Sequence, residues 1–300
     1  MTIQMAKYPV VHVWRSPQAP REIDRPVCMD PPDLAAWLHK MKTEDRKGLG
    51  GRLDTQLLLG EPVRVLQEED GWFQVVVPDQ PTHLDERGYP GWVPSTHLID
   101  HPDYSRAWTK GPLVHVTATT SRLCRADGSI LFLSYMTRLP RVGEQDGDVW
   151  VLTPDGKTGL LPAADVITAS QLPVTDPATR IDDAQRFLGL PYLWAGMSSF
   201  GFDCSGFMYR LFQAGGIRIP RDAHDQFHSG RPIPAKKLAA GDLVFFAHEQ
   251  GTGVIHHVGM MVDHTRFIHS PRSGFPVRIN RLTEEPYHGE CCGGARYEKP

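Results

Sequence analysis

The sequence has few cysteines, no long apolar run and no excess of charge of one sign. Its 300 residues include five cysteines and no Cys-x-x-Cys pair, which argues against a disulfide framework, a zinc ribbon and a thioredoxin-like site. No stretch of about 18 apolar residues occurs, so no membrane span is predicted. The formal net charge is −3, and the lack of a basic excess argues against nucleic acid and membrane surfaces as partners.

The N-terminal segment MTIQMAKYPVVHVWRSPQAP also lacks a continuous apolar stretch of signal-peptide length. The sequence as given therefore predicts a cytoplasmic protein, although a chain whose export signal had been removed would begin in the same way. Glycine and proline are abundant, at 28 and 26 residues. This composition favours short strands and turns over a helical bundle. No pattern in the sequence indicates an oligomeric state.

Changes in residue pattern divide the chain into segments, and the middle of the chain repeats itself. Residues 1–45 are predicted to be an N-terminal extension, with a strand-like YPVVHVW and a helix PDLAAWLHKM capped by Asp33. Residues 46–102 and 103–172 share a frame: Arg-Val, acidic residues with Gly, an aromatic residue in a strand, a turn, and an apolar stretch with Gly and Pro. We interpret these two segments as copies of one small β-barrel unit.

Residues 173–300 begin with helices and continue with strands, an order typical of an α+β domain. The segment SQLPVTDPATR is predicted to be a linker that leads into this domain. Within it, Asp176 followed by Pro177 predicts the start of a helix that runs to Leu188. FDCSGFMYRLFQAGG predicts a second helix, which Gly215 ends. The segments DLVFFAH, HHVGMMVD, RFIHS and PVRINRL predict successive antiparallel strands.

Cys204 lies at the predicted start of the second helix, with Asp203 as its N-cap. A thiol at this position is close to the positive end of the helix macrodipole and to free backbone N–H groups, and both favour the nucleophilic thiolate. The same N–H groups are suited to hold the oxyanion of a tetrahedral intermediate. A buried structural cysteine at a helix end is the alternative interpretation.

Two histidines are predicted to meet across one hairpin. His257 opens the strand VGMMV and His269 ends the strand RFIH, with the turn VDHTR between them. A hairpin centred on this turn places the two positions opposite each other, within a residue or two of register. Their separation is even, so both side chains are predicted on one face. Cys204, His257 and His269 thus form a candidate nucleophile, base and orienting residue.

Simpler interpretations of the histidines remain open. His256, His257 and His264 can be solvated turn residues, and His269 can be a core histidine. A zinc site built from the cysteine and the histidines is a further alternative, although the candidate ligands come from distant segments without the usual short spacing. We expect no metal and no cofactor.

The third segment resembles a known family of enzymes. PYLWAGMSSFGFDCSGFMYRLF, IPRDAHDQ, LAAGDLVFF, HHVGMMVD and FIHSP are similar, in this order, to motifs of the NlpC family of papain-like bacterial cysteine peptidases. The segments GYPGWVPSTHLI and GLLPAADVI resemble bacterial SH3 domains. The resemblance implies tandem SH3-like barrels followed by a papain-like α+β domain with an antiparallel sheet packed on helices, and a catalytic triad of Cys204, His257 and His269.

The resemblance also implies a substrate. NlpC peptidases with this architecture cut the γ-D-glutamyl–diamino acid bond of cell-wall (murein) peptides with a free N-terminal L-Ala, and act in peptidoglycan recycling. In such enzymes an acidic residue and a tyrosine of the first SH3-like domain bind the L-Ala amine, and by position these are Asp54 and Tyr89. Tyr192, Asp203 and Ser205 flank the nucleophile in the matching motif and are expected to bind the same end of the substrate. The diamino acid itself is not specified.

Two other classes of function stay open at this point. The third domain can be a papain-like amidase or acyltransferase that acts on another amide or ester. Alternatively, the protein can be a non-catalytic binder of wall peptides, in which the SH3-like units hold the peptide. A reactive thiol at Cys204 distinguishes the enzymes from the binder.

Overall fold

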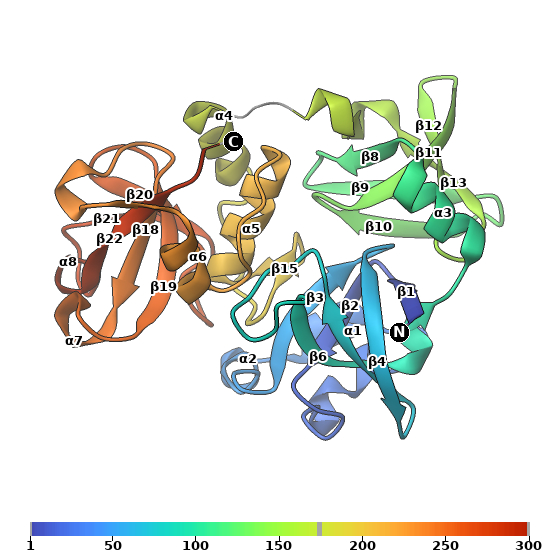
Figure 1. Ribbon diagram of the computed structural model, residues 1–300, viewed down its shortest axis with the longest axis horizontal. Helices are drawn as coiled ribbons and strands as arrows, with labels where there is room; N and C mark the ends of the chain where they lie inside the picture. The colour runs from blue at the N-terminus through green and yellow to red at the C-terminus, as the bar shows by residue number, and fades with distance from the viewer. Residues whose placement is uncertain (1, 173–175, 299–300) are drawn as a thin grey trace. The chain divides into compact units, whose positions relative to one another are not determined.

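The computed structural model describes residues 2–172 and 176–298, so the predicted linker lies partly outside the described residues. The chain forms two compact units. The first unit contains residues 1–79 and 87–172, and the second contains residues 80–86 and 173–300 (Figure 1). Within the described part of the chain, every helix is too short or too polar to cross a bilayer.

The first unit contains two seven-stranded antiparallel sheets with the same strand order. The order is β3-β2-β6-β5-β4-β1-β7 in one sheet and β10-β9-β13-β12-β11-β8-β14 in the other. Each strand therefore has a counterpart seven strands later at the same place in the order, which agrees with the predicted repeat. The strands are β1 (Thr2–Ala6), β2 (Val10–Trp14), β3 (Leu53–Leu58), β4 (Pro62–Glu69), β5 (Trp72–Val77), β6 (Tyr89–Pro94), β7 (Leu98–Ile99), β8 (Leu113–Val116), β9 (Thr120–Arg125), β10 (Ile130–Ser134), β11 (Arg138–Gln145), β12 (Asp148–Leu152), β13 (Thr158–Pro162) and β14 (Val166–Thr168).

The repeat changes the interpretation of residues 1–45, which we expected to be an extension. Strands β1 and β2 pair with β4 and β3, so they belong to the first sheet as β8 and β9 belong to the second. All five residues of β2 are buried, and a strand of this kind needs hydrogen-bonded neighbours to satisfy its backbone. The helical residues of this segment instead form an insertion between the second and third strands, a place where the second sheet has a short turn.

The insertion carries α1 (Leu34–Lys40) and α2 (Thr43–Lys47). Asp33 caps α1 as predicted, because its carboxylate accepts a hydrogen bond from the Ala36 N–H at 2.9 Å. Trp37 of α1 is fully buried, donates its indole N–H to Asp24 at 2.9 Å and contacts the His12 ring of β2. The buried tryptophan therefore fastens the insertion to the first sheet.

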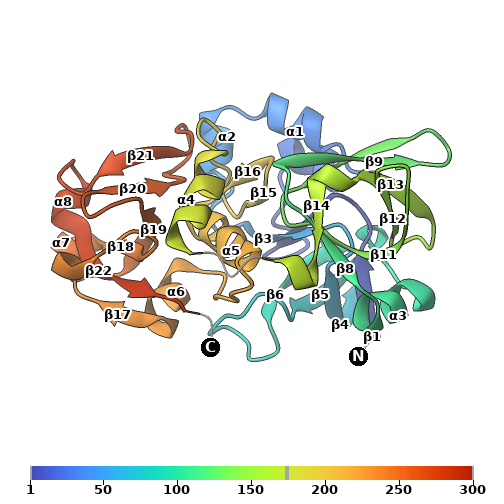
Figure 2. The same cartoon turned by 90° about the horizontal axis from the view of Figure 1, so that it is seen from above.

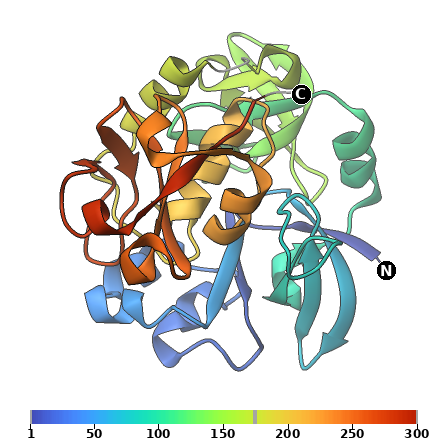
Figure 3. The same cartoon turned by 60° about the vertical axis from the view of Figure 1, so that its left-hand side comes forward.

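The second unit is built on one antiparallel sheet with the order β17-β22-β18-β19-β20-β21. Helices α4, α5 and α6 contact strands of this sheet, and Figure 3 shows α5 beside the orange and red strands. This arrangement confirms the predicted α+β class. Its main elements are α4 (Pro177–Gln185), β15 (Met197–Ser198), β16 (Gly201–Phe202), α5 (Cys204–Ala214), α6 (Ala223–Ser229), β17 (Arg231–Ile233), β18 (Leu243–Ala247), α7 (His248–Gly251), β19 (Ile255–Met261), β20 (Arg266–His269), β21 (Arg278–Arg281), α8 (Tyr287–Glu290) and β22 (Cys291–Arg296); α3 (Pro102–Lys110) belongs to the first unit.

The predicted helices and strands of this unit are present with small changes at their ends. Asp176 caps α4 by accepting from the Thr179 N–H at 2.8 Å, as the Asp-Pro signal indicated. The helix ends at Gln185 rather than Leu188, because the backbone tightens into turns in which the Leu188 N–H bonds back to the Gln185 carbonyl at 3.1 Å. Such tightening is common where a helix loses its regular bonds.

Residues 80–86 follow β5 in the chain but belong to the second unit. The Arg221 N–H donates to the Pro81 carbonyl at 3.0 Å. The His83 N–H donates to one Asp225 oxygen at 3.0 Å, and the His83 ring nitrogen Nδ1 lies 2.7 Å from the other. A segment that is distant in sequence therefore completes the surface beside α6.

Candidate active site

Cys204 is the first residue of α5, and its side chain is 9% exposed. Asp203 is the N-cap, and its carboxylate accepts from the Gly206 N–H at 2.6 Å. α5 packs on β19, and the backbone N–H of Val258, the residue after His257, faces the thiol and lowers its pKa. The thiol therefore lies at the helix start and beside the histidine-bearing strand, as the sequence predicted.

The two histidines meet on this strand pair. His257 Nε2 lies 2.7 Å from His269 Nδ1, which is a hydrogen bond between the two rings. The β19–β20 ladder pairs Met260 with Ile268, so His257 is two residues from the position opposite His269. Aromatic rings surround the pair: Phe246 stacks on His257, and Phe267 and Tyr287 contact His269. Figure 2 shows α8, which carries Tyr287, and α7 together at one end of the sheet.

Burial controls the protonation of these groups. It raises the pKa of the Cys204 thiol to about 12, and the Asp203 carboxylate adds to the increase. Burial also lowers the pKa of His257 well below its usual value and that of His269 to about 4. These shifts favour the neutral thiol and the neutral imidazoles over their charged forms. Desolvation of the charged sulfur thus opposes the thiolate that the helix N-terminus was expected to favour.

A buried ion pair supports the helix start. Arg221 is 1% exposed and donates to both Asp203 oxygens, at 2.6 and 3.3 Å, and to the Ser205 hydroxyl at 2.8 Å. The two predicted substrate-binding residues Asp203 and Ser205 thus share one guanidinium. Arg221 lies inside the motif IPRDAHDQ, but sequence reasoning gave it no role. In the sequence Arg221 is a single arginine between a proline and an aspartate, and this pattern does not indicate a buried side chain.

Tyr192 lies close to the same groups. Its side chain is 6% exposed, and burial together with the nearby Cys204 and Asp203 charges raises its pKa well above the usual value. The phenol thus interacts electrostatically with both the thiol and the helix cap. The structure therefore gathers Tyr192, Asp203, Cys204 and Ser205 around the start of α5.

Asp54 and Tyr89 belong to the first unit and are described there. Asp54 lies on β3 and forms an ion pair with Arg15, whose guanidinium is 2.6 Å from the carboxylate. Tyr89 begins β6, and its 5% exposed side chain packs in the core of the first sheet. Their contact with the substrate remains a prediction. Both carboxylates expected to bind an ammonium, Asp54 and Asp203, already have an arginine partner.

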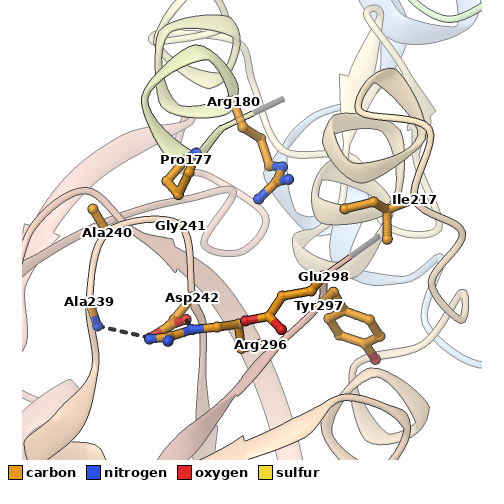
Figure 4. A pocket seen from close by; sticks show the side chains of 10 residues that line it. All are labelled: Pro177, Arg180, Ile217, Ala239, Ala240, Gly241, Asp242, Arg296, Tyr297 and Glu298. Carbon is orange, nitrogen blue, oxygen red and sulfur yellow. Dashed lines mark hydrogen bonds and ion pairs between the residues drawn. The ribbon is translucent and has the colours of Figure 1, made fainter. Parts of the chain in front are cut away.

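Two other features of the second unit contain none of the predicted site residues. His248, His256 and Glu290 bring their ligand atoms within 4.8 Å of one another; the His248 and His256 rings stack at 4.1 Å, and His256 Nε2 lies 3.2 Å from Glu290. A pocket of about 420 Å³ lies elsewhere (Figure 4), and the Arg296 guanidinium donates to Asp242 at 2.8 Å in its wall. The pocket is lined by Pro177, Arg180, Ile217, Ala239, Ala240, Gly241, Asp242, Arg296, Tyr297 and Glu298.

A cysteine at a helix start beside a histidine pair on an antiparallel sheet defines a site of the cysteine-hydrolase class. Comparison with known proteins specifies the family. Residues 189–296 match the NlpC/P60 family, residues 46–98 match the bacterial dipeptidyl-peptidase Sh3 domain, and residues 116–168 match the YKFC SH3b2 domain. The chain belongs to the NlpC/P60 family.

Relatives resemble the chain over nearly its whole length. The γ-D-glutamyl-L-lysine dipeptidyl-peptidase of Bacillus subtilis (strain 168) is 39% identical over 290 residues, which cover 96% of both chains. The protein of the same name from Bacillus cereus (strain ATCC 10987) is 39% identical and aligns over 95% of this chain and 88% of its own length. A crystal structure of an NlpC/P60 family protein from Bacillus cereus superposes with a TM-score of 0.96 at 36% identity, over 99% of this chain and all of that one.

Proposed function

We propose that this protein is a cysteine endopeptidase that hydrolyses the γ-D-glutamyl–diamino acid bond of murein peptides with a free N-terminal L-Ala. The observation that carries the proposal is the 2.7 Å hydrogen bond between His257 and His269 on a strand whose next residue, Val258, faces the Cys204 thiol. The names of the relatives that match over the whole chain support the choice of bond.

The reaction begins with a neutral thiol and a neutral base. His257 takes the proton from Cys204 while the sulfur attacks the γ-carbonyl carbon of D-Glu, because the buried thiol does not ionise by itself at neutral pH. Backbone N–H groups at the start of α5 stabilise the oxyanion. The protonated His257 then gives its proton to the amine of the diamino acid as the C–N bond breaks, which leaves a thioester on Cys204.

Water completes the cycle. His257 accepts a proton from the water that attacks the thioester, and the C–S bond breaks to release the γ-carboxylate and restore the thiol. His269 holds the His257 ring through the bond between them and thereby limits its rotation. No step needs an oxidant, a reductant or a second substrate other than water.

The substrate amine has a further effect on the thiol. Asp203 raises the pKa of Cys204 through its negative charge, and Arg221 only partly offsets this charge. A substrate ammonium bound beside Asp203 and Tyr192 would add a second positive charge and so lower the pKa of the thiol. Binding of the free amine would therefore activate the nucleophile as well as position the peptide.

Defined peptides test the proposal. The protein is incubated with L-Ala-γ-D-Glu-L-Lys and with L-Ala-γ-D-Glu-diaminopimelate, and the products are identified by mass spectrometry. We expect release of L-Ala-γ-D-Glu by the wild type and no release by Cys204→Ala, with an unchanged circular dichroism spectrum. Full activity of Cys204→Ala, or cleavage of simple amides but of neither peptide, would contradict the proposal.

Three further parts of the hypothesis need separate measurements. Asp54→Ala should raise KM for peptides with a free amine more than for N-acetylated peptides if Asp54 and Tyr89 bind that amine. A role in peptidoglycan recycling predicts that released wall peptides accumulate in cells without the protein. Cell fractionation tests the proposed cytoplasmic location.

A further inference from the structure

The hydrogen bonds of the histidine pair continue beyond His269. His269 Nε2 lies 2.9 Å from Asn280 Oδ1, and the Asn280 amide Nδ2 donates to Glu284 Oε2. Glu284 Oε1 in turn accepts from the backbone N–H of Arg281 at 3.0 Å. We call the sequence His257, His269, Asn280 and Glu284 the imidazole relay. We infer that Asn280 and Glu284 are positioning residues that set the tautomer of His257, an inference that rests on the proposed function.

The strand arrangement explains why Asn280 reaches His269. β21 pairs with β20, and Asn280 is directly opposite Phe267. Phe267 and His269 lie on one face of β20 because they are two residues apart, so Asn280 is the diagonal cross-strand neighbour of His269. Glu284 is in the turn that follows β21, and the Arg281 N–H bond holds it there.

Glu284 forms the outer end of the relay, and its protonation state determines which group donates in each hydrogen bond. The hydrogen bonds from Asn280 and Arg281 lower the pKa of Glu284 below its usual value, so Glu284 is a carboxylate and can only accept. Asn280 must therefore direct its NH₂ group toward Glu284 and its carbonyl oxygen toward His269. The carbonyl oxygen can only accept as well, so the His269 Nε2 atom must carry the hydrogen.

This assignment determines the state of His257. A neutral His269 with hydrogen on Nε2 has a lone pair on Nδ1, so the bond to His257 Nε2 requires a hydrogen on that nitrogen of His257. The remaining nitrogen of His257, Nδ1, then keeps its lone pair and can accept the thiol proton. In the opposite tautomer Nδ1 would carry the hydrogen, and His257 could not act as the base.

The relay also stabilises the charged state formed during the reaction. When His257 becomes an imidazolium, its Nε2–H already points at the His269 lone pair, and the Glu284 charge lies at the far end of the same chain of dipoles. The aromatic rings around the pair keep water away, so orientation depends on these hydrogen bonds rather than on solvent. Glu284 itself is exposed, so its removal should affect stability little.

Variants at positions 280 and 284 test whether these residues orient the imidazole rings or only stabilise the fold. Asn280→Leu removes the acceptor for His269. Glu284→Gln allows the Asn280 amide to turn around, because the new amide can donate or accept. The double variant Asn280→Asp with Glu284→Gln restores the polarity, since a carboxylate at position 280 accepts from both sides. Glu285→Gln is the matched control, because Glu285 is an adjacent exposed glutamate whose side chain pairs with His288 at 3.8 Å and does not contact the relay.

Two readouts test the inference. In protein labelled with ¹⁵N histidine and assigned with His257→Gln and His269→Gln, we expect hydrogen-bearing Nε2 and hydrogen-free Nδ1 signals for both rings. Asn280→Leu and Glu284→Gln should lose this pattern, and the double exchange and Glu285→Gln should keep it. We expect kcat to fall at least about tenfold for Asn280→Leu with KM within about twofold, since only transition-state stabilisation is lost; an enforced wrong tautomer reduces kcat by about 10⁴-fold in a serine-protease triad.

The inference on the relay and the proposed function can fail separately, and the outcomes of these experiments differ in the two cases. An unchanged ¹⁵N pattern in Asn280→Leu, or equal kcat values for Glu284→Gln and Glu285→Gln, would overturn the relay. Failure of the double exchange to recover both readouts would do the same. Because the ring signals are recorded without substrate, the expected pattern in a protein that cleaves none of the peptides would support the relay and overturn the proposed function.

Discussion

Arg221 provides the most direct test of how the site is held together. Arg221→Met leaves the Asp203 carboxylate buried without its cation, and removal of one partner from a buried ion pair costs about 3–5 kcal/mol. A loss of this size should lower the midpoint of thermal unfolding of the second unit by about 10–20 °C, given about 3–4 °C per kcal/mol, which lies between the usual values for domains of about 60–100 and of about 150–250 residues. The removed hydrogen bonds include those at 2.6 and 3.3 Å to Asp203 and the one at 2.8 Å to Ser205.

Thermal unfolding followed by near-ultraviolet circular dichroism measures this loss. Arg221→Lys keeps the charge but not the planar fork, so we expect a smaller decrease of about 1–2 kcal/mol. The double variant with Asp203→Asn removes the unpaired charge and keeps a helix-capping side chain, so it should recover part of the stability. A midpoint for Arg221→Met within about 2 °C of the wild type would refute the reasoning, because a carboxylate in that environment cannot lose its cation without cost.

Three further predictions concern protonation and packing. His12 is fully buried, and burial lowers its pKa to about 3. As pH falls from about 6.5 to 3, His12 therefore binds a proton in the unfolded chain but not in the folded one, and the free energy of unfolding should fall by about 4 kcal/mol. His12→Gln should flatten this dependence of unfolding on pH. Iodoacetamide at pH 7 should modify exposed Cys124 faster than buried Cys204, as peptide mapping will show. Because burial raises the pKa of the Cys204 thiol, slow labelling of Cys204 is expected of the enzyme as well and does not indicate a non-catalytic binder, whereas faster labelling of Cys204 than of Cys124 would contradict the raised pKa. Gly206→Ala should lower the unfolding midpoint because a Cβ there would lie 2.2 Å from a backbone oxygen, whereas Gly289→Ala, with open space around it, should not.

Local signals in the sequence were sufficient for most of the second unit. The Asp-Pro start of α4, the N-cap Asp203, and the even spacing of His257 and His269 each depend on residues near one another in the chain. The hairpin register followed from the position of its turn, and the structure confirms it within two residues. Strands β17 and β22 were not predicted, because their pairing joins segments about sixty residues apart and leaves no short-range pattern.

The remaining features depend on contacts that sequence alone does not encode. The order of strands in the two sheets shows that β1 and β2 are part of the repeat, but the insertion between β2 and β3 hid this match. The pKa of Cys204 is raised because α5 is covered on several sides, and a helix-end argument contains no information on such burial. Arg221, Asn280 and Glu284 act through partners that folding brings close, so their residue types gave no signal of a role.

Residues 80–86 form hydrogen bonds with Arg221 and Asp225, and these bonds limit where the chain can be truncated or its domains exchanged. An expression clone that starts at the linker would encode Cys204, His257 and His269 but would omit the short stretch that bonds to Arg221 and to α6. Chimeras made by exchanging whole SH3-like modules would replace that stretch with a foreign one. The second unit is thus discontinuous along the gene, and recombination at its apparent boundary would remove part of it.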